Sequence, residues 1–411
     1  MTQQRTPVYP VDASAGTSQM HKAGSIPLRI FAICLTSLVV AVHYTNYGPL
    51  IPTLINDLHI SSGQTGLFST FLFSGLAVMY IPAGTLADRY GQRPVLIGSS
   101  VLLVLGAVLL PLSPNLSWIL VCRFIVGLGA GAAFVAGASV AAGLGKHASL
   151  GQGLYGGSVQ IGSGLGLLLT PHLLTYFGWR GSFLFWGLLG IASIIIWLFV
   201  SDGHGTHAAS RMTLKAGLRS RAVWTLGLSH MGTFGLGNAM AAWIAVYFAF
   251  QYGISLGLAA TLGSLALLTG IFFRPLGGIL IARRVIGAIP LLRIGTILGC
   301  LGVGLLAIPL RFPPLAILGT ACIAIGTTIP YTSVFNEAAH LRDIGKGVAQ
   351  GLVSMISTPT VLLGPPLIGL LFGYTHDFVL AFVSIMFFGC VAITASFLAG
   401  SAIKREKDQL D

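Results

Sequence analysis

The sequence predicts an all-α membrane protein in which twelve transmembrane helices form two parallel six-helix repeats. Three observations lead there: few charges, a series of long apolar runs, and a faint similarity between the two halves of the chain. Only 8% of the residues are charged and the mean hydropathy is +0.88, whereas an ordinary soluble protein carries about 25% charged residues. So few charges cannot cover a water-facing surface, and most of the chain must therefore lie in lipid.

Each apolar run between polar breaks is long enough to cross a bilayer as a helix. The predicted spans are 27–53, 65–87, 94–112, 116–142, 149–176, 181–201, 222–250, 257–282, 288–310, 313–339, 347–373 and 377–401. They divide the chain into a tail (1–24), a six-helix bundle (25–201), a linker (202–221), a second six-helix bundle (222–403) and a second tail (404–411). The mixed polar composition of the first tail predicts disorder and lacks the pattern of a cleaved signal peptide.

Two pairs of segments support a repeat. "GQGLYGG" at 151–157 aligns with "AQGLVSM" at 349–355, at an offset of 198 residues. "IPAGTLADR" at 81–89 aligns with "RPLGGILIAR" at 274–283, which places Gly84 opposite Gly278. Parallel six-helix repeats are typical of transporters whose halves rock about a central binding site.

The positions of Lys and Arg predict the orientation. Alternate connections between spans hold most of the basic residues, namely Arg89, Arg93, Lys146, Arg211, Lys215, Arg219, Arg221, Arg283, Arg284, Arg342 and Lys346. The connections on the other side hold only Arg180 and Arg311. The positive-inside rule therefore places both termini in the cytoplasm. The net charge of +12 is attributed to topology and to contact with lipid headgroups, and no nucleic-acid partner is expected.

One short turn concentrates charge between two apolar runs. "GTLADRYGQR", residues 84–93, resembles the signature loop of the major facilitator superfamily, Gly-x-Leu-Ala-Asp-Arg-x-Gly-Arg/Lys-Arg/Lys. "RFIVGLGAGAAF", residues 123–134, is similar to the helix-four element of the same superfamily. The resemblance covers essentially the whole chain and implies a secondary transporter that works by rocker-switch alternating access. The short loops and tails favour a bacterial inner (plasma) membrane.

The loop is a candidate conformational gate. Asp88 lies at the C-terminal end of a predicted helix, where the helix dipole disfavours a negative charge, so it needs a partner. The resemblance implies a contact between Asp88 and the start of helix eleven near Lys346. Glycines in the loop permit a tight turn and close backbone approach. The alternative is that the charges only mark a cytoplasmic loop. The predicted gate residues are Gly84, Asp88, Arg89, Gly91 and Arg93.

Ionisable groups inside a bilayer are costly and point to function. No Asp or Glu falls near the middle of a predicted span, so a carboxylate proton relay has no obvious residue. Two arginines do lie at depth, and a guanidinium suits recognition of carboxylate, nitrate or phosphate-like anions. The predicted substrate-binding residues are Arg274, Arg123, His43, Tyr44 and Tyr47. As alternatives, Arg123 could bond helix-end carbonyls, Arg274 could reach toward the cytoplasm, and His43 and His230 could be packing residues.

One branch of the superfamily shares a local pattern with this chain. "RPLGG" at 274–278 and the Gly-rich stretch 156–166 resemble the nitrate/nitrite porters and other small-anion carriers. Those porters carry a second arginine in helix two, before Ile-Pro-x-Gly, where this chain has Tyr80. Half of their anion clamp is therefore missing, which counts against nitrate itself.

The sequence thus predicts a transporter of a small anion or polar organic solute, acting as a monomer and not as an enzyme. A coupling proton or a counter-transported anion is a further expected partner, and neither a cofactor nor a metal is expected. Two alternatives stay open: an exporter of hydrophobic compounds, and a membrane sensor that binds ligand without net transport.

Overall fold

A computed structural model describes residues 26–144, 147–201, 214–341, 344 and 346–408, which form helices and no strand. The first half consists of α1 (Ile26–Thr45), η1 (Gly48–Leu50), α2 (Ile51–Leu58), α3 (Ser62–Tyr90), α4 (Gln92–Leu109), η2 (Leu110–Leu112), α5 (Leu116–Ala142) and α6 (Ala148–Phe199). The second half consists of α7 (Leu214–Arg219), α8 (Arg221–His230), the π-helical turn η4 (Met231–Gly235), α9 (Leu236–Tyr252), α10 (Leu256–Leu268), α11 (Gly270–Ala282), α12 (Ala288–Ala307), α13 (Pro313–Thr328), α14 (Tyr331–Ala339), α15 (Lys346–Ser357), α16 (Pro359–Thr375) and α17 (Val379–Asp408).

These helices confirm the predicted twelve spans. Among the described residues, 11 helical stretches are long and apolar enough to cross a membrane, and one of them, Gly151–Phe199, has 49 residues. A single crossing needs about 20 residues, so this stretch crosses twice. Its reversal lies at Gly178, whose φ of +64° is a conformation that glycine adopts without strain. The predicted spans 116–142 and 313–339 coincide with the observed ones.

Local sequence signals set several helix ends. Ser61 and Gln64 form a capping box at the start of α3, and the Asn115 side chain caps α5 by accepting a hydrogen bond from the Trp118 N–H. Between α3 and α4, Gly91 takes a φ of +89°, so the tight turn that the sequence predicts there is present.

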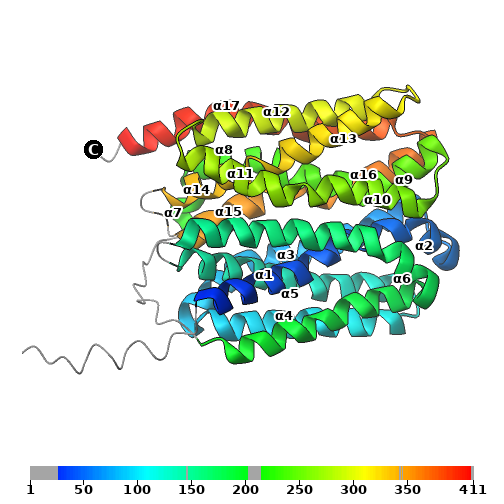
Figure 1. Cartoon of the computed structure of the whole chain (residues 1–411), viewed down its shortest axis with the longest axis horizontal. Coiled ribbons are helices and arrows are strands. Elements are labelled where there is room, and N and C mark those ends of the chain that lie inside the picture. Colours follow the sequence, from blue (N-terminus) through cyan, green and yellow to red (C-terminus); the bar gives the residue numbers. More distant parts are fainter. Residues whose placement is uncertain (1–25, 145–146, 202–213, 342–343, 345, 409–411) are drawn as a thin grey trace, which may run out of the picture.

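The two halves lie side by side, with α1 to α6 in the lower part of Figure 1 and α8 to α17 in the upper part. Two pairs of membrane crossings join them. The crossing formed by α3 packs against that formed by α15 and α16, and the first crossing of α6 packs against that formed by α10 and α11. These pairs occupy corresponding positions in the two repeats. The binding region between the halves is therefore lined by segments far apart in the sequence.

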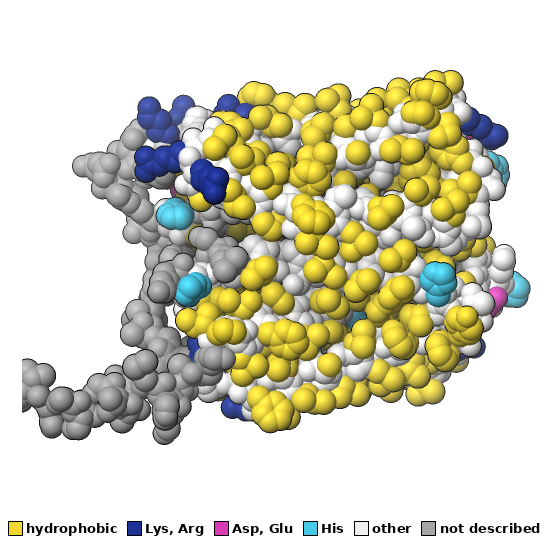
Figure 2. Space-filling view, viewed as in Figure 1, with side chains coloured by type: hydrophobic (Ala, Val, Ile, Leu, Met, Phe, Trp, Pro, Cys, Tyr) yellow, Lys and Arg dark blue, Asp and Glu magenta, His cyan; other side chains and the backbone are white. Residues whose placement is uncertain are grey.

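The surface has an apolar belt and one basic end. Figure 2 shows hydrophobic side chains along the length of the bundle and most of the visible Lys and Arg gathered at the end where the chain terminates. We call this the basic end, defined by Arg89, Arg93, Arg219, Arg221 and Arg283. The arrangement fits a protein that spans a membrane, with its basic end at one aqueous face.

Helix breaks are concentrated in the second half. Its central crossings are interrupted at η4, at Thr269 between α10 and α11, at Pro330 between α13 and α14, and at Thr358 before Pro359. Proline lacks the N–H that a continuing helix needs, which explains two of the breaks. Breaks inside the membrane are tolerated where neighbouring helices satisfy the backbone, and here they lie close to the site described below.

The predicted tails and linker fit the structure only in part. The tail 1–24 and the stretch 202–213 of the linker lie outside the described residues, while α7 forms the rest of the linker up to Arg219. The C-terminal helix α17 runs past the predicted bundle boundary at 403, as far as Asp408. Glu406 holds this extension against the start of α8, because its carboxylate accepts hydrogen bonds from Ser220 Oγ (2.8 Å) and the Ala222 N–H (3.1 Å).

Candidate functional site

Arg274 is the buried cation at the interface between the halves. It lies on α11 and is 5% exposed. Its guanidinium donates a hydrogen bond to the Gly156 carbonyl on α6, with an N–O distance of 2.7 Å. It also lies over the ring of Tyr331 on α14, 4.1 Å from the ring centroid. The side chain therefore reaches from the second half onto a helix of the first.

A glycine makes this arrangement possible. A Cβ at position 156 would lie 3.0 Å from Tyr331 Cε1 and 3.5 Å from the terminal nitrogen of Arg274. The approach to Tyr331 is too close for a methyl group without a shift of the ring, whereas the approach to Arg274 is an ordinary van der Waals contact. Gly156 therefore allows the guanidinium and the aromatic ring to lie together against the backbone of α6.

The charge of Arg274 has no anionic partner in the part of the chain that the structure describes. No carboxylate there lies within ion-pair distance of the guanidinium, and its buried Nε has no hydrogen-bond partner. A buried unpaired charge is unfavourable, even when one carbonyl and one ring face partly compensate it. Such a group is well prepared to bind an anion, which would supply both the missing charge and the missing acceptor.

Aromatic side chains from both halves surround this position. Tyr331, Tyr44 and Tyr155 lie near enough to Arg274 to interact with it electrostatically. Ring centroids are 4.7 Å apart for Tyr331 and Phe335, and 5.0 Å apart for Tyr44 and Phe73. We call the whole group the aromatic cluster: Tyr44, Phe73, Tyr80, Phe134 and Tyr155 from the first half, and Phe234, Tyr331 and Phe335 from the second.

Three ring contacts within the aromatic cluster cross between the halves. Phe234 approaches Phe73 at 5.8 Å and Tyr44 at 6.5 Å, both edge-on, and Phe134 approaches Phe335 at 6.3 Å. These distances fall in the range of favourable aromatic pairs. The rings therefore close the centre of the molecule in this conformation.

His230 lies beside the aromatic cluster at the π-helical turn. Its Nδ1 is 2.6 Å from Thr233 Oγ1, and its ring stacks on Phe234 at 5.6 Å and meets Phe335 edge-on at 5.2 Å. The sequence offers His230 as a packing residue or a site residue, and its ring contacts place it at the wall of the central region.

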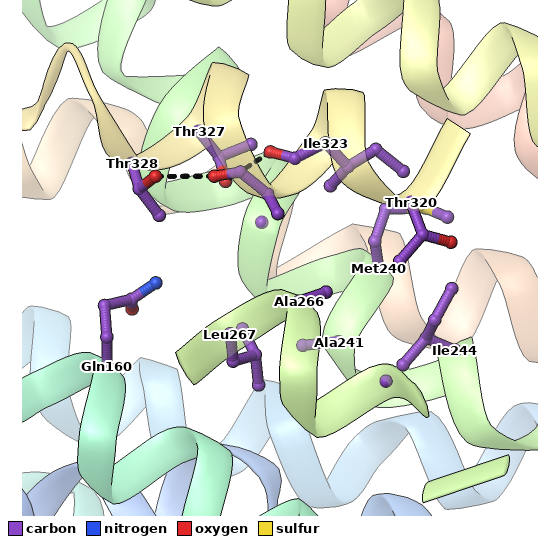
Figure 3. Close-up of a pocket in the computed structure, with 13 residues that line it drawn as sticks. Gln160, Met240, Ala241, Ile244, Ala266, Leu267, Thr320, Ile323, Thr327 and Thr328 are labelled. Carbon is purple, nitrogen blue, oxygen red and sulfur yellow. Dashed lines mark hydrogen bonds between the residues drawn. The ribbon is translucent and has the colours of Figure 1, made fainter. Parts of the chain in front are cut away.

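A small cavity lies next to this region, between α6, α9, α10 and α13 (Figure 3). Gln160 points into it from α6, and Thr327 and Thr328 line the opposite wall from α13. The volume of about 30 Å³ has room for roughly two water molecules. Gln160 also packs against Gly270, one turn before Arg274 on the same crossing. The cavity is thus an unfilled part of the interface, too small in this conformation for a larger solute.

Arg123 is also buried, but its surroundings differ from those of Arg274. Its nitrogens donate to the carbonyls of Phe68 (3.1 Å) and His43 (2.8 Å) and to Asn46 Oδ1 (3.3 Å). The ring of Tyr47 lies 5.6 Å from the guanidinium. All of these partners belong to the first half, so Arg123 connects α5 to α1 and α3 within one bundle.

The other residues predicted to bind substrate separate into two groups. Tyr44 belongs to the aromatic cluster at the interface. His43 and Tyr47 lie with Arg123: the Nδ1 of His43 is 3.5 Å from Asn46 Nδ2, and its buried Nε2 has no partner. The ring of Tyr47 stacks on Phe68 at 6.1 Å, also within the first half. The five predicted residues therefore do not form one site.

The predicted gate residues lie around the α3–α4 turn. Arg93 donates to the carbonyls of Trp197 (2.9 Å) and Leu198 (2.8 Å) at the end of α6, within its own half. Arg89 is exposed and lies over Tyr90 at 5.2 Å. A Cβ at Gly84 would meet only Val135, at an ordinary 3.7 Å, so no close backbone approach occurs there.

The contact predicted for this loop lies outside the described part. The side chains of Asp88 and Lys346 are not among those that the structure describes, so their pairing stays a prediction.

The end opposite to the basic end is sealed between the halves. A Cβ at Gly66 on α3 would lie 2.3 Å from Pro366 Cα on α16, so the two backbones are in direct contact. Thr70 Oγ1 on α3 also donates to the Leu362 carbonyl on α16 (2.5 Å). Within the second half, Trp243 Nε1 donates to the neighbouring Pro365 carbonyl (3.0 Å). The two halves are therefore in direct contact at this end, through α3 and α16.

Several residues at the site carry no distinctive sequence signal. The sequence contains 11 Tyr and 23 Phe, and nothing in their spacing marks Tyr331, Tyr155 or Phe335. Tyr80 does carry a sequence signal, because it precedes Ile-Pro-x-Gly at the position where the nitrate/nitrite porters have an arginine.

Two bundles of membrane-crossing helices with a buried, unneutralised cation between them define a membrane transport protein. The chain belongs to the Major Facilitator Superfamily, whose sequence profile matches residues 33–356. Members of this superfamily are membrane transporters and not enzymes.

Individual relatives agree with this assignment. An MFS-type transporter of Mycobacterium tuberculosis is 32% identical over 154 residues, which cover 37% of this chain and only 22% of that protein. The nitrite extrusion protein of Bacillus subtilis is 24% identical over 346 residues, covering 82% of this chain and 85% of that protein. A solved inward-facing, occupied structure of a bacterial homologue of the human lysosomal transporter Spinster has the same fold. Its TM-score is 0.75 at 18% identity, covering 93% of this chain and 99% of that one.

Proposed function

We propose that the protein carries a small anion across the membrane and that Arg274 is the main anchor of that anion. The observation that carries the proposal is the charge of Arg274, which is buried between the halves and has no carboxylate partner in the described residues. The resemblance to a nitrite extrusion protein over most of the chain supports an anionic substrate. Tyr44 and the other rings of the aromatic cluster form the walls of the site.

The anion would cross the membrane by alternating access to the site at Arg274. Because Arg274 and Gly156 belong to different halves, rocking of the halves breaks or forms this bond and exposes the guanidinium to one side of the membrane at a time. A proton or a counter-transported anion is the proposed coupling partner. The basic end is proposed to face the cytoplasm of a bacterial cell, with the protein acting as a monomer in the plasma membrane.

Arg123, His43 and Tyr47 receive a different proposed role. Because the guanidinium of Arg123 already has three acceptors within the first half, we assign these residues to the rigidity of that bundle. Arg93 receives the same assignment from its bonds to the end of α6. Asp88 remains the proposed partner of the start of α15.

The test measures anion binding and flux with and without the guanidinium. The purified full-length protein is screened by thermal shift against nitrite, acetate and other small anions, and hits are measured for uptake in proteoliposomes. We expect Arg274→Ala to weaken binding of the effective anion by about tenfold to a hundredfold, the usual effect of losing a charge-assisted hydrogen bond. Without ligand, the variant should be no less stable than the wild type, since the change removes an unpaired charge.

Arg293→Gln is the matched control, because Arg293 also bonds backbone carbonyls, those of Ser396 and Phe397, but lies away from the interface. It should keep the ligand-induced shift. If instead neutral or lipophilic compounds shift both the wild type and Arg274→Ala equally, the protein is an exporter of hydrophobic compounds and the proposal is wrong. Ligand binding without flux would identify a sensor.

A further inference from the structure

The number of available cations at the interface limits the charge of the substrate. Of the two buried arginines in the described residues, Arg123 is committed to acceptors within the first half, which leaves Arg274. On the helix of the first half that corresponds to α11, the matching turn of α3 carries Tyr80, which is 1% exposed and 5.8 Å from Phe134. A substrate with two negative charges would therefore leave one of them unmatched among aromatic rings.

The side chains around Arg274 also limit which apolar group the substrate can carry beside its charge. Besides the Gly156 carbonyl, the groups placed around Arg274 are tyrosines: its guanidinium lies over the Tyr331 ring at 4.1 Å, and Tyr44 and Tyr155 are near enough to interact with it electrostatically. The ring contacts of Phe234 with Tyr44 and Phe73, and of Phe134 with Phe335, cross between the halves. Each of these contacts is lost when the halves separate.

A planar ring entering between the separated halves would replace those lost contacts. Aromatic pairs are stabilised beyond the burial of their area, so a substrate ring gains binding energy where an aliphatic group of equal size does not. A carboxylate on that ring can reach the unpartnered Nε of Arg274. The cavity beside Gln160, of about 30 Å³, is too small for a ring and is lined by neither Arg274 nor the aromatic cluster, so a ring would enter only as the halves part.

From these constraints we infer that the substrate is an aromatic or heteroaromatic monocarboxylate, held by Arg274 through its carboxylate and by the aromatic cluster through its ring. Tyr331 is then a specificity-determining residue, because it orients the guanidinium and also offers a ring face. Tyr80 contributes to specificity by excluding a second charge. The inference rests on the proposed function, since it requires an anion anchored on Arg274.

The experiment compares ligands that differ in one property. The full-length protein in lipid nanodiscs is titrated calorimetrically with benzoate, cyclohexanecarboxylate (same charge, no planar ring), benzamide (same ring, no charge), phthalate (two charges), acetate and nitrite. Benzoate should bind at least tenfold more tightly than each of the others. Arg274→Ala should abolish the preference for benzoate over benzamide. These comparisons need no variant in the aromatic cluster, so they remain informative even if such variants fail to fold.

A pair of substitutions at one position tests the ring. Tyr331→Phe keeps the face over which the guanidinium lies and should bind benzoate within about threefold of the wild type, whereas Tyr331→Leu should lose most of the preference for benzoate over cyclohexanecarboxylate. If acetate or nitrite binds as tightly as benzoate in an Arg274-dependent way, the aromatic inference is overturned and the anion proposal stands. If benzamide and benzoate bind alike in both wild type and Arg274→Ala, both are overturned.

Discussion

At the scale of single residues, the environment of a side chain separates two buried arginines that look alike in the sequence. Arg123 has three acceptors from its own bundle. Arg274 has one carbonyl, one ring face and an unpartnered Nε. The hydrogen-bonding capacity of Arg123 is therefore used within its bundle, whereas Arg274 keeps a donor that a ligand could use.

A glycine next to Arg274 gives a residue-scale prediction. Gly156→Ala should weaken anion binding by about three- to tenfold, because the new methyl group would displace the Tyr331 ring over which the Arg274 guanidinium lies. The adjacent Gly157 is the control, since a Cβ there meets nothing within 4 Å. Gly157→Ala gains the same helix propensity and should bind the anion like the wild type. Equal affinities of the two variants in calorimetric titration would contradict this role of Gly156.

At the scale of helices, the seal opposite to the basic end depends on backbone contact between α3 and α16. Gly66 is placed so that a Cβ would lie 2.3 Å from both the Cα and the nitrogen of Pro366, and neither atom can rotate away. The seal is therefore sensitive to the smallest possible substitution. The same two helices are tied by the hydrogen bond from Thr70 Oγ1 to the Leu362 carbonyl.

Gly66→Ala should hold this end open and reduce the transport rate by about tenfold or more, because alternating access requires both ends to close in turn. Hydrogen exchange at the backbone of residues 62–70 and 362–370 should become faster than in the wild type. Gly63→Ala, on the same helix, is the control, because a Cβ there would meet Leu370 at an ordinary 3.6 Å. Unchanged exchange and flux in Gly66→Ala would show that the seal forms without this contact.

At the scale of the whole molecule, the two halves repeat one another in their contacts as well as their helix count. Arg93 at the start of α4 bonds the carbonyls at the end of α6, and Arg293 near the start of α12 bonds those of α17. The site itself breaks this symmetry, since Arg274 and the interrupted helices belong to the second half.

The distribution of basic residues gives a prediction for the whole molecule. The basic end should face the cytoplasm, because positively charged connections are retained on that side during insertion. Green fluorescent protein fused after Asp411 should fluoresce in a bacterial host, and alkaline phosphatase inserted after His59, at the opposite end, should be active. Alkaline phosphatase inserted after Gly287, at the basic end, should be inactive. The reverse pattern would contradict the orientation.

Much of this architecture is readable from the sequence, because lipid imposes a simple rule on a spanning chain. Backbone groups must bond within their own helix, so apolar length alone locates the crossings, as at 116–142 and 313–339. The tight turn at Gly91 and the burial of Arg274 at depth also follow from local pattern. The continuation of α17 to Asp408 does not, since it depends on Glu406 meeting the start of α8 far away in the sequence.

The sequence by itself determined that this is a two-bundle membrane transporter with a cation at depth and no acid beside it in the chain. The tertiary structure alone shows which of the two buried arginines lies between the halves, and that Tyr331, Tyr44 and Tyr155 lie near it. The physical reason is that a side chain's partners come from helices distant in sequence. Composition and spacing fix how each helix lies in lipid, whereas the packing of one bundle against the other fixes what each buried charge meets.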